Sequence, residues 1–130
     1  MEIGYETGLQ GRRDELPHLV FLHGAGGRGA GWLGLLSPLG KKWNTIALDL
    51  PGHGDTLGPA LSSIPDLVQW LDKALAELKI KRFILAGHSM GGALAQSFAL
   101  AHPGRAKGLA LIGTGGHLPV NPKLLQGLEV

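Results

Sequence analysis

The sequence predicts an α/β protein with a doubly wound, mainly parallel sheet of about four core strands and flanking helices. Short, continuous apolar runs recur along the chain, as in strands that are buried on both faces of a sheet. Helical patterns separate these runs, and such an alternation favours parallel pairing through crossover connections. Glycine is abundant, with 22 of 130 residues, which indicates loops where the backbone bends sharply or approaches another group.

The expected strands follow from the apolar runs. Residues 3–7 predict a short edge strand. Buried strands are expected at residues 18–22, 45–48, 83–86 and 109–112. Glycine or polar residues follow each buried run, and these residues are typical of the turn that ends a strand.

Helices are expected between the strands, at residues 32–39, 64–78 and 91–102, and another is expected to open between 122 and 130. The second helix has the clearest pattern, because its apolar residues fall on one face at helical spacing. Ser63, with Asp66 three residues later, predicts a capping box at its start. Pro103 and Gly104 end the third helix.

Composition excludes several classes of protein. Twelve Lys and Arg against ten Asp and Glu give a net charge of +2, and the basic residues lie in isolated pairs without interleaved aromatics, so no nucleic-acid partner is expected. The absence of cysteine excludes disulfides, thiolate metal sites and a cysteine nucleophile. With neither a signal-peptide pattern nor an apolar run of membrane-spanning length, we expect one domain over 1–130 in the cytoplasm, without a membrane span.

A G-x-S-x-G pattern occurs at residues 87–91, where a buried strand turns directly into a helix. That turn forces Ser89 into a strained conformation, and glycine two residues to either side avoids a clash. The hydroxyl is then expected at the carboxyl end of the sheet, where the following helix favours a developing negative charge. The pattern therefore predicts a nucleophile at Ser89, with a serine N-cap in a tight turn as the alternative.

A glycine-rich loop, HGAGG at residues 23–27, follows another buried strand. Glycine lets this backbone approach a bound carbonyl oxygen, so we expect the N–H groups of Ala25 and Met90 to form an oxyanion hole. The residues expected to support this loop and the serine turn are His23, Gly24, Gly87, His88 and Gly91. A phosphate-binding loop is the competing interpretation, but no G-x-x-x-x-G-K-[ST] pattern is present.

Four segments occur in an order that resembles the amino-terminal half of an α/β-hydrolase-fold serine hydrolase of the esterase or lipase type: HGAGG at 23–27, LDLPGHG at 48–54, GHSMGG at 87–92 and LIGT at 111–114. The resemblance implies that Ser89 is the nucleophile, that the amides of Ala25 and Met90 form the oxyanion hole, and that the substrate is a small ester or acyl compound. It also implies that the strand before Ser89 lies beside the strand before His23, and that neither a metal nor an organic cofactor takes part.

The family's catalytic triad runs in the order Ser, then Asp or Glu, then His. After Ser89 the chain contains a single carboxylate side chain, Glu129, and two histidines, His102 and His117. His102 is expected at the far end of the helix that follows Ser89, whereas His117 follows the last strand at the active-site end of the sheet. We therefore expect the acid and the base to be missing and the chain to be inactive alone, with the family's cap region starting at about residue 119.

The remaining polar residues have structural expectations. His23 is expected to hold the glycine-rich loop by hydrogen bonds, and His53 to rim the pocket. His88 is expected to point away from Ser89 and to pack or bond to backbone. His18 is expected to be exposed, and Asp49 to fix the turn that follows its strand.

A non-catalytic alternative remains open, in which the chain is a binding or self-associating module derived from a hydrolase. No helix is available in the sequence to cover the strand at 109–112, so we expect this edge to join a second copy or a missing carboxyl-terminal half. The substrate stays open among carboxylesterase, lactonase, thioesterase, monoacylglycerol lipase and cofactor-free haloperoxidase activities. Serine at position 89 argues against haloalkane dehalogenases and epoxide hydrolases, which place aspartate there.

Overall fold

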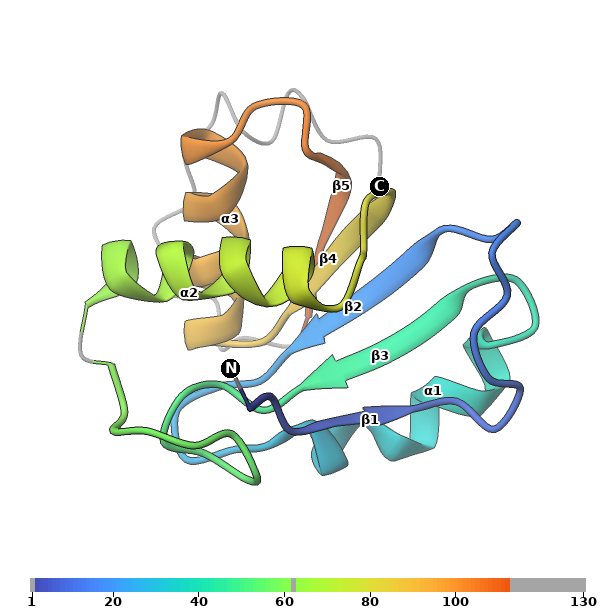
Figure 1. The fold of residues 1–130 in the computed structure, drawn as a ribbon, viewed down its shortest axis with the longest axis horizontal. Helices are drawn as coiled ribbons and strands as arrows, with labels where there is room; N and C mark the ends of the chain where they lie inside the picture. The colour runs from blue at the N-terminus through green and yellow to red at the C-terminus, as the bar shows by residue number, and fades with distance from the viewer. Residues whose placement is uncertain (1, 62, 113–130) are drawn as a thin grey trace.

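The computed structural model describes residues 2–61 and 63–112, which form one five-stranded sheet in the order β1-β3-β2-β4-β5 (Figure 1). The strands are β1 (Tyr5–Thr7), β2 (His18–Leu22), β3 (Asn44–Leu48), β4 (Phe83–Gly87) and β5 (Ala106–Leu111). β1 pairs antiparallel with β3, and all other neighbours are parallel. The prediction of a mainly parallel sheet is confirmed, and β2 and β4 are neighbours as the family resemblance implied.

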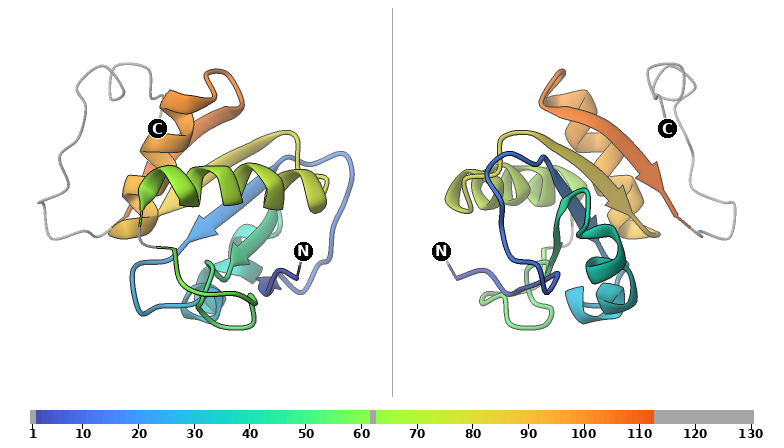
Figure 2. Two further views of the ribbon diagram at one scale, coloured as in Figure 1. Left: turned by 60° about the vertical axis from the view of Figure 1, so that its left-hand side comes forward. Right: turned by 90° about the vertical axis from the view of Figure 1, so that its right-hand side faces the viewer.

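The helices of the described chain are η1 (Gly29–Trp32, a 3₁₀ turn), α1 (Leu33–Leu39), α2 (Ile64–Glu77) and α3 (Met90–Ala101). α2 and α3 pack on one face of the sheet, and α1 packs on the other (Figures 1 and 2). This arrangement on both faces confirms the doubly wound prediction. Among the described residues, no helix combines the length and the apolar character needed to cross a membrane.

Side chains along β2 alternate between two apolar cores, one on each face of the sheet. Val20 and Leu22 join the larger core with α2 and α3, whereas Leu19 and Phe21 join the smaller core beneath α1. Because successive residues of a strand point to opposite faces, a run that is apolar throughout needs cover on both sides. This explains why the buried runs of the sequence predicted the strands so well.

The observed elements differ from the expected ones mainly at the edges. The first expected helix divides into η1 and α1. β5 begins at Ala106 rather than at residue 109, because pairing with β4 extends across the weakly apolar Ala-Lys-Gly segment through a register shift at Phe83 and Ile84. The expected helix at 122–130 and the cap region from 119 lie outside the described residues.

α2 is held at both ends by specific hydrogen bonds. At its start, the Asp66 N–H donates to the Ser63 hydroxyl over 3.2 Å, which confirms that serine as the cap. At its end, the Arg12 guanidinium donates to the carbonyl oxygens of Leu78 and Lys79 over 2.7 and 2.6 Å. A cation placed there also interacts favourably with the negative end of the helix dipole.

Asp49 fixes the chain at the carboxyl end of β3, as expected. Its side chain is buried, with the residue only 3% exposed, and its two carboxylate oxygens accept hydrogen bonds from different loops. The N–H of Gly29 donates to one oxygen over 2.6 Å, and the N–H of Asp55 donates to the other over 2.9 Å. One carboxylate thus joins the start of η1 to the turn that follows β3.

His18 is not exposed, contrary to expectation. It is the first residue of β2, lies between Asn44 of β3 and Phe83 of β4, and is only 7% exposed. Burial, reinforced by the nearby Arg12 guanidinium, lowers the pKa of His18 from 6.5 to about 4. The folded protein therefore holds this imidazole neutral at pH values where the unfolded chain protonates it.

The lowered pKa of His18 predicts that the folded protein loses stability in mild acid. The folded-state pKa lies below the unfolded value, so its contribution is complete above pH 6.5 and disappears as the pH falls towards 4. We expect this residue to lower the free energy of unfolding by at most about 3 kcal/mol across that window. Urea denaturation at pH 7, 6, 5 and 4 measures the slope, which should weaken in His18→Asn but not in His102→Asn. An unchanged slope in His18→Asn would contradict this assignment.

The two hydrogen bonds that the Asp49 carboxylate accepts predict that its substitution lowers stability. Asp49→Asn keeps the size of the side chain but replaces one acceptor oxygen with an NH₂ group, so one of the two loop amides loses its partner. We expect the free energy of unfolding at pH 7 to fall by about 2 kcal/mol. Asp14→Asn is the matched control, because the Asp14 side chain is 97% exposed, and it should change stability by less than about 0.5 kcal/mol. Equal effects of the two substitutions would be inconsistent with this role.

Candidate active site at the carboxyl end of the sheet

Ser89 lies in the turn between β4 and α3 with a left-handed backbone, φ 56° and ψ −117°. Such a conformation costs a non-glycine residue about 1–3 kcal/mol and persists only where the surroundings impose it. The residue is exposed, and its side chain makes no capping hydrogen bond to α3. Ser89 is therefore the N-cap residue of α3 by position, as the alternative expected, but its hydroxyl does not cap the helix.

The glycines on either side of Ser89 are required by close packing. A Cβ atom on Gly87 would overlap the carbonyl oxygen of Gly91, and a Cβ on Gly91 would overlap the carbonyl oxygen of Leu22. The same Leu22 oxygen accepts a hydrogen bond from the His88 N–H over 3.1 Å. The end of β2 is thus packed directly against the turn that contains Ser89. A glycine hydrogen fits between them, whereas a Cβ atom does not.

His23 holds the glycine-rich loop by hydrogen bonds, as expected. Its Nδ1 donates to the Gly24 carbonyl oxygen over 2.7 Å, and its Nε2 accepts from the Leu50 N–H over 2.9 Å. Only a neutral ring with its proton on Nδ1 makes both bonds. Burial lowers the pKa of His23, against the smaller raising effect of the Gly24 bond, and so favours this neutral form.

His53 extends this framework rather than rimming the cavity. Its Nε2 accepts from the Gly26 N–H over 3.1 Å, and its Nδ1 bonds the Pro51 carbonyl oxygen over 3.0 Å. Its ring centroid lies 4.9 Å from that of His23. The two histidines together bind the loop at 23–27 to the segment after β3, and the expectation for His53 was wrong because its ring faces the loop backbone.

The glycine-rich loop lies directly beside the serine. A Cβ placed on Gly24 would lie 3.2 Å from the Cβ of Ser89, so the loop backbone approaches the serine within van der Waals contact. Ala25 is exposed and Met90 half-buried. Neither of their amides donates a hydrogen bond to any residue in the ranges 2–61 and 63–112.

A cavity of about 290 Å³ opens next to this loop, lined by His23, Gly24, Gly27, Arg28, Gly31, Trp32, His88 and Ile112. His88 is exposed and lines the cavity, so the expectation that its ring packs was wrong. A Cβ placed on Gly24 would lie 3.4 Å from the His88 Nδ1, so the ring lies beside the glycine-rich loop. Sequence reasoning missed Arg28 and Trp32, although their position immediately after the glycine-rich loop is a usable signal.

After Ser89 the sequence offers two histidines and one carboxylate as catalytic partners. His102 is the residue that follows the far end of α3, and it packs on Phe98, with ring centroids 4.8 Å apart. At 1.5 Å per residue it lies about 20 Å from Ser89 along the helix axis, too far to take a proton from the serine. His117 and Glu129 lie outside the described residues.

A model of the alpha/beta hydrolase fold family matches residues 17–128. A 2-succinyl-6-hydroxy-2,4-cyclohexadiene-1-carboxylate synthase from Enterobacter sp. (strain 638) is 39% identical over 101 residues, which cover 78% of this chain and 38% of that protein. A pimeloyl-(acyl-carrier protein) methyl ester esterase from Aeromonas hydrophila is 34% identical over 98 residues, 75% of this chain and 38% of the esterase.

Solved structures show the same similarity. A bacterial membrane phospholipase A superposes with a TM-score of 0.78 at 34% identity, over 92% of this chain and 38% of its own. A haloalkane dehalogenase from Bradyrhizobium elkani USDA94 superposes with a TM-score of 0.75 at 32% identity, over 86% of this chain and 38% of the dehalogenase. The chain thus spans well under half the length of these relatives. The family match over most of the chain, together with the sheet order and the serine turn, shows that the chain belongs to the alpha/beta hydrolase fold family.

Proposed function

We propose that this chain supplies the nucleophile and the oxyanion hole of a serine hydrolase that acts on esters or related acyl compounds. The observation that carries the proposal is the left-handed backbone of Ser89 at the junction of β4 and α3. Strain of this kind is retained where it has a use, and here it exposes a hydroxyl beside a loop with free amides. The esterase and phospholipase among the similar proteins support an acyl substrate.

The proposed reaction begins with attack of Ser89 Oγ on the substrate's carbonyl carbon. The carbonyl oxygen gains negative charge, which the N–H groups of Ala25 and Met90 and the amino-terminal end of α3 stabilise. Collapse of the tetrahedral intermediate expels the alcohol and leaves an acyl group on Ser89. Water then hydrolyses this ester, releasing a carboxylic acid and restoring the serine.

The attack also requires a base, because the hydroxyl of Ser89 loses its proton as the new bond forms. The Ser89 side chain makes no hydrogen bond to α3, and His102 lies at the opposite end of that helix. We therefore propose that the acid and the base are missing from this chain and that the chain alone is nearly inactive. Loss of triad members typically lowers the rate by several orders of magnitude but leaves the effect of the oxyanion hole.

The cavity beside the loop suggests where an acyl chain binds. Trp32 and Ile112 contribute apolar surface to it, and Trp32 is held against Phe21 with ring centroids 4.9 Å apart. Arg28 lies on the same cavity and makes only a long contact of 3.7 Å with the exposed Asp55. We propose that the apolar part of the substrate occupies this cavity while its carbonyl group meets Ser89.

Labelling with a fluorophosphonate probe tests the role of Ser89. We expect slow labelling of the purified chain, several orders of magnitude below the rate of a complete serine hydrolase, because the oxyanion hole is present without a base. Ser89→Ala should remove the label. Ser97→Ala, which changes another serine on α3, should leave labelling unchanged.

Each contrary result has a distinct meaning when circular dichroism shows that the variants are folded. Labelling that persists in Ser89→Ala would overturn the nucleophile. Labelling as fast as in a complete hydrolase would overturn the missing base and direct attention first to His117. A chain that stays unlabelled would contradict a usable nucleophile and favour a non-catalytic module.

The edge of the sheet favours the second candidate function, self-association. Within residues 2–61 and 63–112, β5 pairs only with β4. Ile84, Ala110 and Ile112 are only partly buried on the face that α1 covers elsewhere. An unpaired edge strand next to partly exposed apolar side chains can pair with a strand of another chain. This module would bind a second copy of itself whether or not Ser89 reacts.

Sedimentation at tens of micromolar tests this candidate. We expect a dimer or larger species, and Ala110→Lys should shift the mass to the monomer, because a charge near the edge disfavours strand pairing. Ala76→Lys, an exposed position on α2, is the matched control and should leave the assembly unchanged. A strictly monomeric wild-type chain would rule self-association out.

A further inference from the structure

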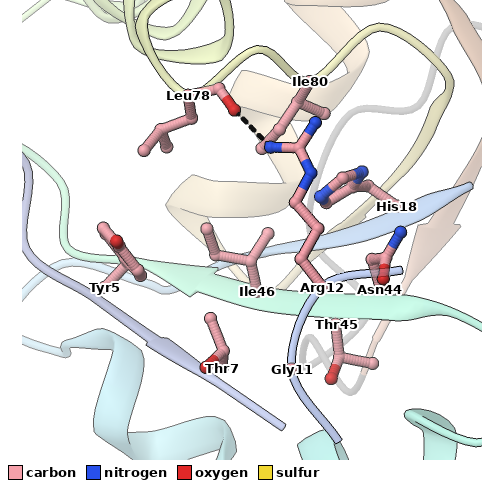
Figure 3. Close-up of a pocket in the computed structure, with 10 residues that line it drawn as sticks. All are labelled: Tyr5, Thr7, Gly11, Arg12, His18, Asn44, Thr45, Ile46, Leu78 and Ile80. Atoms are coloured by element: carbon pink, nitrogen blue, oxygen red, sulfur yellow. Dashed lines mark hydrogen bonds between the residues drawn. The ribbon is translucent and has the colours of Figure 1, made fainter. Parts of the chain in front are cut away.

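Two adjoining cavities lie at the amino end of the sheet, opposite Ser89, and Figure 3 shows the residues that line the first of them. The first, the apolar cavity, has a volume of about 130 Å³ and is lined in part by Tyr5, Ile46, Leu78 and Ile80. The second, the basic cavity, has about 180 Å³ and is lined in part by Asp14, Lys79, Lys81 and Arg82. Both are lined by Arg12, His18 and Asn44, so the two cavities adjoin at these residues, and together they are called the hollow below.

His18 stands at the junction of the two cavities. The residue is 93% buried, and its imidazole makes no hydrogen bond to any described residue. Its ring nitrogens are not among the buried atoms that lack a partner, so they remain open to water or to a ligand in the two cavities. With a pKa near 4 the ring is neutral at pH 7, so it offers one N–H donor and one acceptor to a group in the hollow.

The basic cavity carries an excess of positive charge. Arg12, Lys79, Lys81 and Arg82 line it, and Asp14 is the single carboxylate among its lining residues. The Asp14 side chain is almost fully exposed, and its 3.9 Å contact with the Arg12 Nε is long. The four cations are exposed as well, but they outnumber the single carboxylate around one cavity, so their combined field favours an anion, above all one with two charges.

Arg12 is fixed where the two cavities meet. Its two terminal nitrogens donate to the carbonyl oxygens of Leu78 and Lys79, and Figure 3 shows the guanidinium held at the end of α2 beside His18. These bonds orient the group but do not neutralise its charge. An anion would meet a cation that is already ordered, so little side-chain entropy is lost on binding.

The volume of the apolar cavity limits the size of the apolar group that an anionic ligand could place there. An apolar cavity of roughly 150 Å³ in a protein interior is large enough for benzene. The apolar cavity here is close to that volume, and Tyr5, Ile46 and Ile80 surround it. A compact ring or a short branched chain fits it, whereas a long acyl chain does not.

From this juxtaposition we propose that the amino end of the sheet binds a phosphate monoester with a compact apolar group. The phosphate lies in the basic cavity against Arg12, Lys81 and Arg82, and the apolar group enters the apolar cavity. His18 donates a hydrogen bond to the phosphate from between them. This binding site is independent of the reaction proposed for Ser89.

Titration of the ¹⁵N-labelled chain with phenyl phosphate, followed by NMR, tests this site. Inorganic phosphate supplies the charge alone, phenol supplies the ring alone, and benzoate replaces the phosphate by a carboxylate. We expect saturable shifts at Arg12, His18 and Ile80, and phenyl phosphate should bind about ten-fold more tightly than each of the other three probes. Ser89→Ala should bind it as the wild type does, which separates this result from the labelling experiment.

Charge reversal provides the matched pair of variants. Lys81→Glu should weaken phenyl phosphate binding about ten-fold, whereas Lys73→Glu, an equal charge change on α2 outside both cavities, should change it less than about two-fold. Lys79→Gly is the second variant. It removes another cation of the basic cavity, and glycine adopts the left-handed φ of 56° at this position without strain. Equal affinities for all four probes, equal effects of Lys81→Glu and Lys73→Glu, or the absence of saturable shifts would each overturn the proposal.

Discussion

The packing of the β4–α3 turn onto the end of β2 is the constraint on which the carboxyl end of this sheet depends. Parallel pairing sets Gly87 opposite Leu22, and the Leu22 carbonyl oxygen then accepts the His88 N–H and presses against Gly91. No side chain fits in that space. Ser89 therefore has a left-handed backbone as a consequence of packing, and the strain is supported by the buried strands on either side.

A polar framework of two imidazole rings and one carboxylate holds the loops around that turn. Asp49 joins the start of η1 to the turn after β3, and His23 and His53 each connect a backbone carbonyl with a backbone amide. These bonds use the N–H groups of Gly26, Gly29 and Leu50 and leave that of Ala25 without a described partner. His23 and His53 are thus occupied in positioning backbone, whereas His88 is exposed and lines the cavity.

Local patterns were sufficient to predict the strands, the cap at Ser63 and the place of Ser89, because each follows from neighbours in the sequence. The histidines were harder to predict, since their surroundings come from distant segments. His18 begins an apolar strand and is buried by the segment around Arg12, while His53 turns to the loop amide of Gly26. His88 lines the cavity beside Gly24, which follows a different strand. In all three cases, contacts with segments distant in the sequence determine where the histidine lies.

The two ends of β2 are separate electrostatic environments. Five residues at about 3.3 Å each place His18 about 16 Å from His23, and charges that far apart in salt solution are largely screened. A phosphate bound beside Arg12, as proposed, would therefore have little effect through its field on the oxyanion proposed at Ser89. Coupling between the ends, if binding produces any, requires movement of β2, and that strand is paired on both sides and buried along its whole length. The rigid sheet that positions Ser89 thus keeps the hollow at the other end independent of its chemistry.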